Sequence, residues 1–137
     1  MPKAEQGDPR RLVTLAELLW LHTVAVVEFG GSDGVRDRGL LESALARPLA
    51  GFGGRHLYET ACLRAAALAE ALIQNHGFVD GNKRAAMYAM ALWLERESLI
   101  LNAEQDELVE FAVGLAVHRI DLATAAKWLE RRTVGAR

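Results

Sequence analysis

One short stretch of the sequence concentrates the side chains that could do chemistry: His76-Gly77-Phe78-Val79-Asp80-Gly81-Asn82-Lys83-Arg84. This motif places a base, a carboxylate, an amide and two cations within nine residues. A histidine normally titrates near neutrality, so His76 can take a proton from a hydroxyl that attacks phosphorus. Asp80 offers the hard oxygen ligands that bind Mg²⁺ together with phosphates.

The second half of the motif has the features of an anion site. Asn82, Lys83 and Arg84 fall at the expected start of a helix, where backbone N–H groups lack intrahelical acceptors and the helix dipole is positive. Gly81 lets a bulky anion approach the backbone and tolerates a positive φ. The two cations suit phosphate oxygens. The motif therefore predicts metal-assisted transfer from a nucleotide to a hydroxyl, with the histidine as base and the aspartate as metal ligand.

Two apolar helices are expected to hold the motif. Residues 61–73 are rich in Ala and Leu without Gly or Pro, and residues 85–94 carry no charge. Residues 133–137 are expected to be loose. Four further helices are expected: one capped by Thr14 and ending at Gly30, one capped by Asp37 and ended by Pro48, one opened by a capping box of Asn102 and Gln105, and one beginning at Asp121.

The stretch 50–58 has no helical pattern. Its closely spaced glycines predict a short hairpin or a mobile flap. Within it, Arg55 and His56 have two interpretations, contact with nucleotide or target and simple solvation, and the second is favoured. The whole pattern predicts an all-α single domain with at most one small hairpin.

The motif resembles the signature of the Fic/Doc family, His-x-Phe-x-Asp/Glu-Gly/Ala-Asn-Gly/Lys-Arg, and every fixed position is met. Residues 30–48 also look like the Doc (death on curing) branch, and the resemblance runs from about 12 to 129. Lys83 is typical of that branch, whereas Fic proteins that transfer AMP usually carry Gly there. Gly77 and Ala85 replace a frequent Pro and Thr without removing a catalytic group.

This resemblance implies a Fic/Doc fold over residues 1–137, with its core at about 12–132 and about six helices around a central helix-loop-helix. It implies a β-hairpin flap beside the active site, where Gly53, Arg55, His56 and Leu57 position a target segment as an added strand. Gly81, Asn82, Lys83 and Arg84 would then bind the nucleotide, His76 would be the general base and Asp80 the metal ligand.

The activity implied by the Doc branch is that of a toxin kinase. It would transfer the γ-phosphate of ATP, with Mg²⁺, to a Ser or Thr hydroxyl of a cytoplasmic protein, a threonine of elongation factor Tu, and so arrest translation. A Phd-type antitoxin with a disordered tail is the implied partner. Two alternatives stay open: a Fic-type AMP transferase, and a silent member that only binds nucleotide or a partner protein.

Other interpretations compete with these roles. A Walker loop is excluded because Lys83 does not directly follow Gly and no Ser or Thr follows it. A single His or Asp beside a helix start is more often a cap than a catalyst, but the full set at fixed offsets favours a site. His22, on an apolar helix stripe, is favoured as a buried structural histidine. Arg36 and Asp37 fit a site role or a turn-fixing pair equally well.

Composition narrows the class of protein. The chain has 137 residues, a formal net charge of −2 and a pI near 6.1, which gives no basic footprint for nucleic acid. No apolar run is long enough to span a bilayer, and the polar start lacks a signal-peptide pattern. The single cysteine, Cys62, cannot form an internal disulfide, so a reducing cytoplasm is the expected setting.

Overall fold

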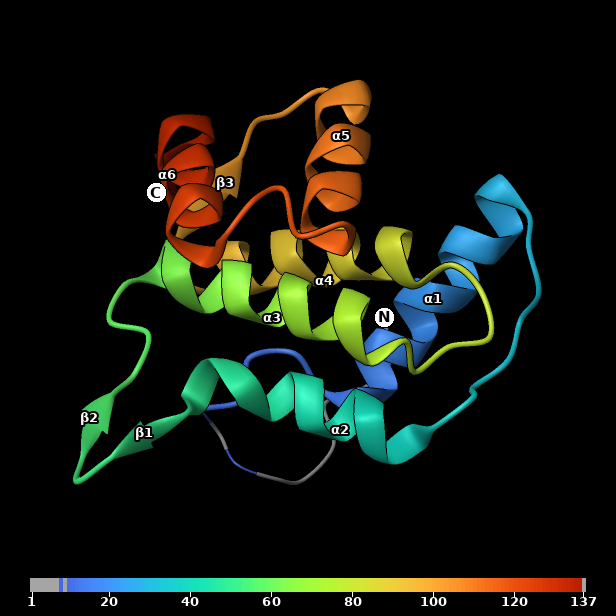
Figure 1. Cartoon of the computed structure of the whole chain (residues 1–137), viewed down its shortest axis with the longest axis horizontal. Coiled ribbons are helices and arrows are strands. Elements are labelled where there is room, and N and C mark those ends of the chain that lie inside the picture. Colours follow the sequence, from blue (N-terminus) through green and yellow to red (C-terminus); the bar gives the residue numbers. More distant parts are fainter. Residues whose placement is uncertain (1–7, 9, 137) are drawn as a thin grey trace.

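The structure is a computed structural model that describes residue 8 and residues 10–136. Its described part contains six α-helices, one short 3₁₀ helix and two small antiparallel strand pairs (Figure 1). In chain order these are α1 Leu15–Phe29, α2 Arg38–Ala46, η1 Arg47–Leu49, β1 Gly51–Phe52, β2 Arg55–His56, α3 Ala61–Asn75, α4 Asn82–Arg96, β3 Leu99–Leu101, α5 Gln105–Ala116, α6 Leu122–Arg132 and β4 Thr133–Gly135.

Helices α3 and α4 form the centre of the fold, as the apolar segments predict. Figure 1 shows them in the middle of the molecule, with α2 on one side, α5 and α6 on the other, and α1 beside α4. Most of their residues are buried, and many are alanines, whose small side chains let helix backbones approach closely. The all-α architecture with a central helix-loop-helix is confirmed. The motif joins the two best-packed helices.

Most of the predicted helix starts are confirmed. Thr14 and Glu17 form the capping box of α1, with Glu17 N donating to Thr14 Oγ1 at 3.2 Å. Asp37 caps α2, and Asp121 caps α6. The capping box predicted from Asn102 is wrong. Helix α5 begins at Gln105 with Glu104 as its cap, because Asn102 still extends the β3–β4 pairing through its N–H bond to Arg132 O at 2.7 Å.

The strand pair of β3 and β4 was not predicted. Leu99 pairs with Gly135 and Leu101 with Thr133, so residues 133–135, expected to be loose, are a strand. Their partner lies more than thirty residues earlier in the chain, and three residues carry no periodicity that identifies a strand. The pairing ties the end of α6 back to the end of α4.

The predicted hairpin is present as β1 and β2, with Gly51 opposite His56 and Phe52 opposite Arg55. It precedes α3, whereas the motif follows α3, and Figure 1 shows the two at opposite ends of that helix. A 15-residue helix is about 22 Å long. The expectation that this hairpin lies beside the motif is therefore wrong for this structure.

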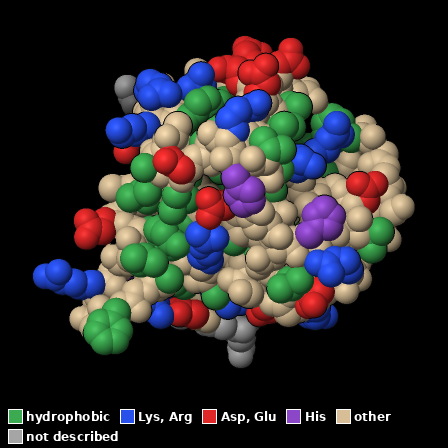
Figure 2. Space-filling view, viewed as in Figure 1, with side chains coloured by type: hydrophobic (Ala, Val, Ile, Leu, Met, Phe, Trp, Pro, Cys, Tyr) green, Lys and Arg blue, Asp and Glu red, His purple; other side chains and the backbone are tan. Residues whose placement is uncertain are grey.

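The surface carries charges of both signs. On the face seen in Figure 2, acidic and basic side chains are interspersed, and no single sign covers it. A hydrophobic side chain projects from the surface over the β1–β2 hairpin in the same view. Among the described residues, no helix is both long and apolar enough to cross a bilayer.

Candidate active site

The reactive side chains predicted from the motif meet in one cavity of about 670 Å³. Its wall is formed by the end of α3, the loop, the first turn of α4 and the Gly30-Gly31 segment after α1. The base, the carboxylate and both cations therefore face a shared space large enough for a phosphate chain. The lining includes His76, Asp80, Gly81, Asn82, Lys83 and Arg84.

His76 caps the C-terminus of α3 in an unusual backbone conformation. Its φ of 53° and ψ of 49° are left-handed, a region that non-glycine residues rarely occupy. This conformation turns the chain out of the helix, and the His76 side chain is exposed at the cavity. An exposed imidazole at the cavity wall is available for proton transfer.

Asp80 is exposed and held by backbone N–H groups. Its Oδ1 accepts from Gly81 N at 2.9 Å and its Oδ2 from Ser32 N at 3.3 Å. Gly31 lies so close that a Cβ there would come within 2.7 Å of Asp80 Oδ2, and its φ is +110°. Sequence reasoning did not single out Gly31 for the site. The only signal was the glycine pair that ends α1.

The side chain of Asn82 has a structural role that the sequence did not predict. Its side chain is buried, its Oδ1 accepts from Phe78 N at 3.0 Å and its Nδ2 donates to Phe78 O at 3.0 Å. Both ends of the amide are thus used to close the loop, so the predicted contact of Asn82 with phosphate would come from its backbone. The backbone of Asn82 still begins α4, where N–H groups point toward the cavity end of the helix.

His22 supports the motif from behind, which confirms the structural interpretation. It is buried, its ring stacks on Phe78 with centroids 3.7 Å apart, and its Nε2 donates to Asp80 O at 2.7 Å. Gly81 lies against the same ring, and its left-handed φ of +77° is the reason that glycine is favoured at this position. Asp33 Oδ1 lies 3.5 Å from His22 Nδ1. The histidine therefore fixes the position of the loop backbone that carries the Asp80 carboxylate.

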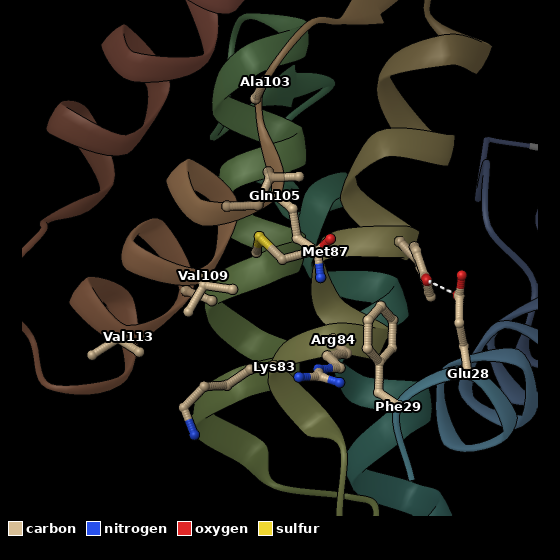
Figure 3. A pocket seen from close by; sticks show the side chains of 12 residues that line it. Glu28, Phe29, Lys83, Arg84, Met87, Ala103, Gln105, Val109 and Val113 are labelled. Atoms are coloured by element: carbon tan, nitrogen blue, oxygen red, sulfur yellow. Dashed lines mark hydrogen bonds between the residues drawn. The ribbon is translucent and has the colours of Figure 1, made fainter.

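Lys83 and Arg84 lie in the first turn of α4, before the first helical bond from Ala85 N to Gly81 O at 3.0 Å. Among the described residues neither cation has an ion pair or a side-chain hydrogen bond, so both keep their donors for an anion. Arg84 rests on the ring of Phe29, 3.9 Å from its centroid, and Figure 3 shows the two side chains together.

The end of α1 contacts α4 at a second point one helical turn further along. Tyr88 donates from its hydroxyl to Glu28 at 2.7 Å, the bond drawn in Figure 3. Burial, and then the Glu28 carboxylate, raise the pKa of Tyr88 to about 12. An adjoining cavity of about 450 Å³ continues from Phe29 and Arg84 between α4 and α5. It is largely apolar, with Met87, Leu108, Val109, Ala112 and Val113 in its wall.

Arg36, Asp37 and the hairpin residues lie apart from the cavity or have partners other than those predicted. Arg36 and Asp37 do not pair: Arg36 binds carbonyls at the end of α3, and Asp37 caps α2. Arg64 pairs with Glu97 at 2.7 Å, near the hairpin end of α3. The hairpin residues assigned to target positioning are exposed and distant from the motif: Gly53, Arg55, His56 and Leu57.

The residues present fit Mg²⁺ held jointly with phosphates better than a dedicated metal cage. Among the described residues, no group of three or more His, Cys, Asp or Glu side chains could hold a metal ion. Mg²⁺ is commonly bound by one or two carboxylates together with phosphate oxygens of the substrate and several waters. A single carboxylate beside a cavity large enough for a phosphate chain matches that arrangement. Asp80 is the residue that would hold it.

Comparison with known sequences identifies the family. The sequence profile of the Fic/DOC family matches residues 12–94, which include α1 to α3, most of α4 and the whole motif. The chain belongs to the Fic/DOC family. The resemblance inferred from the motif is therefore confirmed, together with the fold class.

Two curated relatives carry names from this family. "Toxin Doc" of Mycolicibacterium smegmatis is 43% identical over 84 residues, which are 61% of this chain and 65% of that protein. "Protein kinase doc" of Escherichia phage P1 is 29% identical over 121 residues, 88% of this chain and 94% of that protein. The aligned part thus spans less than two thirds of the first relative and nearly all of the second.

Proposed function

We propose that this chain is a Doc-type toxin of a toxin-antitoxin system that acts as a protein kinase. It transfers the γ-phosphate of ATP to a Ser or Thr hydroxyl of a target protein. The convergence in one cavity of His76, Asp80 and two cations that have no carboxylate partner within the described residues carries this proposal. The names of the two relatives support it.

The chemistry follows from the positions of these groups. The target hydroxyl oxygen attacks the γ-phosphorus, the bond from that phosphorus to the bridging oxygen breaks, and ADP leaves. His76 accepts the proton of the attacking hydroxyl. Lys83, Arg84 and the first amides of α4 bind the phosphate oxygens and neutralise their charge. Phosphoryl transfer depends mainly on such positioning and charge neutralisation, which a small domain can supply.

Asp80 would hold Mg²⁺, which when bound neutralises charge on the phosphates. The backbone donors from Gly81 and Ser32 fix the orientation of this carboxylate. Gly31 leaves the space that the carboxylate needs. The protein therefore orients the metal ligand without adding a second acidic side chain.

The proposed target is elongation factor Tu, modified on a threonine, with arrest of translation as the result. This part rests on the resemblance to the Doc branch. The proposed partner is a Phd-type antitoxin whose tail folds in the apolar cavity between α4 and α5, next to Arg84. Val113→Asp in that cavity should weaken antitoxin binding and leave transfer unchanged, which binding and transfer assays measure separately.

The test uses ATP labelled either at the γ-phosphate or at the α-phosphate, incubated with purified protein, Mg²⁺ and a bacterial lysate. Label entering protein from the γ position alone supports the kinase. Label entering from the α position would show AMP transfer instead, and no label from either position would indicate a silent binding protein.

Two variants assign the roles of the reactive groups. His76→Ala should keep ATP binding and lose transfer, whereas His118→Ala, which removes another exposed left-handed histidine, should keep both. Asp80→Ala should weaken ATP binding mainly when Mg²⁺ is present. Equal weakening without Mg²⁺ would contradict the metal role.

A further inference from the structure

The left-handed conformation of His76 needs a restraint, because an L-residue with a side chain avoids that region. The candidate base stands at the exposed end of α3, where helices fray and the last carbonyls lack intrahelical donors. The residue that supplies those donors comes from a different part of the chain. It is Arg36, in the segment before α2.

Arg36 binds three consecutive carbonyls. Its Nε donates to His76 O at 2.7 Å, its Nη2 donates to Asn75 O at 2.9 Å, and its backbone N donates to Gly77 O at 2.8 Å. Asp37 N adds a second bond to Gly77 O at 3.0 Å. The carbonyls of the residues immediately before, at and after position 76 thus all accept hydrogen bonds from one short segment.

The guanidinium is suited to this task in two ways. A cation at a helix C-terminus interacts favourably with the helix dipole. The planar fork of Arg donates from two nitrogens in a fixed geometry, whereas Lys donates from one nitrogen on a flexible stem. Among the described residues Arg36 forms no ion pair with a carboxylate, so its side-chain bonds go to these carbonyls alone.

We propose that Arg36 is a positioning residue that locks the His76 backbone in its left-handed conformation and so aims the imidazole into the cavity. Arg36 itself is not part of the cavity wall and acts only through the main chain. The consequence for catalysis rests on the proposed function, whereas the locking of His76 does not. The two can therefore be tested separately.

The locking is tested by ¹⁵N relaxation of the His76 and Gly77 amides in the full chain. In the wild type these amides should have order parameters near 0.85, and in Arg36→Ala they should fall below about 0.6. Arg36→Lys should give intermediate values. Arg38→Ala is the matched control, because this nearby exposed arginine forms no side-chain bond to the motif within the described residues. Unchanged order parameters in Arg36→Ala would overturn the proposal.

The catalytic consequence is measured with the transfer assay on the same proteins. Loss of charge-assisted hydrogen bonds should lower kcat by about 10- to 100-fold. The KM for ATP should stay close to the wild-type value, since Arg36 does not line the cavity. A raised KM with unchanged kcat would overturn the positioning role. Mobile amides in Arg36→Ala, with no transfer by any protein including the wild type, would support the locking and contradict the proposed kinase.

Discussion

The substitution Asn82→Ala separates a structural role from phosphate binding. In the structure the buried Asn82 amide bridges the N–H and C=O of Phe78, each at 3.0 Å. Alanine would leave both backbone groups without a partner beneath a side chain that is 1% exposed. The loop that carries Asp80 would then lose its internal closure.

The magnitude follows from those two bonds. A buried polar group left unpaired costs about 1–3 kcal/mol, so two such groups predict a loss of about 2–4 kcal/mol in the free energy of unfolding once some relaxation toward the cavity is allowed. Urea unfolding measures this loss by linear extrapolation. Asn102→Ala is the control, since Asn102 is exposed and its side chain has no bond within the described residues, and it should change stability by less than about 0.5 kcal/mol.

ATP affinity measured on the same two variants completes the test. If the Asn82 side chain holds the loop closed, Asn82→Ala should lower the free energy of unfolding, and any loss of ATP affinity should be the smaller effect. If Asn82→Ala instead weakened ATP binding at unchanged unfolding free energy, the assignment of this amide to the loop would be refuted, and a direct contact of the side chain with phosphate would be supported.

Three further expectations concern stability and nucleotide affinity. Phe29→Leu should weaken ATP binding, measured by calorimetry, about 3- to 30-fold because it removes the ring beneath Arg84, and Val27→Ala is the control. An unchanged ATP affinity in Phe29→Leu would contradict the stacking role. Gly77→Ala should cost about 1–3 kcal/mol in urea unfolding, since its Cβ would lie 2.5 Å from a buried leucine, and an unchanged midpoint would count against this packing. Arg96 holds the pKa of Glu17 below its ordinary range, so the pair stabilises the fold fully above about pH 4.3, and this stabilisation is lost as pH falls through the pKa of the folded state. In Glu17→Gln the free energy of unfolding should therefore depend less on pH in this acidic range. A pH dependence equal to that of the wild type would refute the role of the pair.

What could be predicted from the sequence was local. The motif, the first turn of α4 and the caps of α1, α2 and α6 depend on residues a few positions apart, and the structure has them as expected. The apolar segments also identified α3 and α4, because an uncharged or alanine-rich helix has to be buried. These features fixed the all-α fold and brought the reactive residues of the motif together.

What could not be predicted depends on partners remote in sequence or on backbone groups. The role of Asn82 is set by the main chain of Phe78, which leaves no trace in residue type. The same holds for Arg36, whose acceptors are carbonyls about forty positions away. The β3–β4 pair joins segments from both sides of α5 and α6. The hairpin was recognised from its glycines, but its distance from the motif is set by the length of α3.

The intact mass of purified elongation factor Tu, after incubation with this protein and Mg²⁺-ATP, tests the proposed kinase activity. We expect a gain of one phosphate with the wild type and no gain with His76→Ala. A gain of one AMP, or a phosphate gain that persists in His76→Ala, would contradict this expectation.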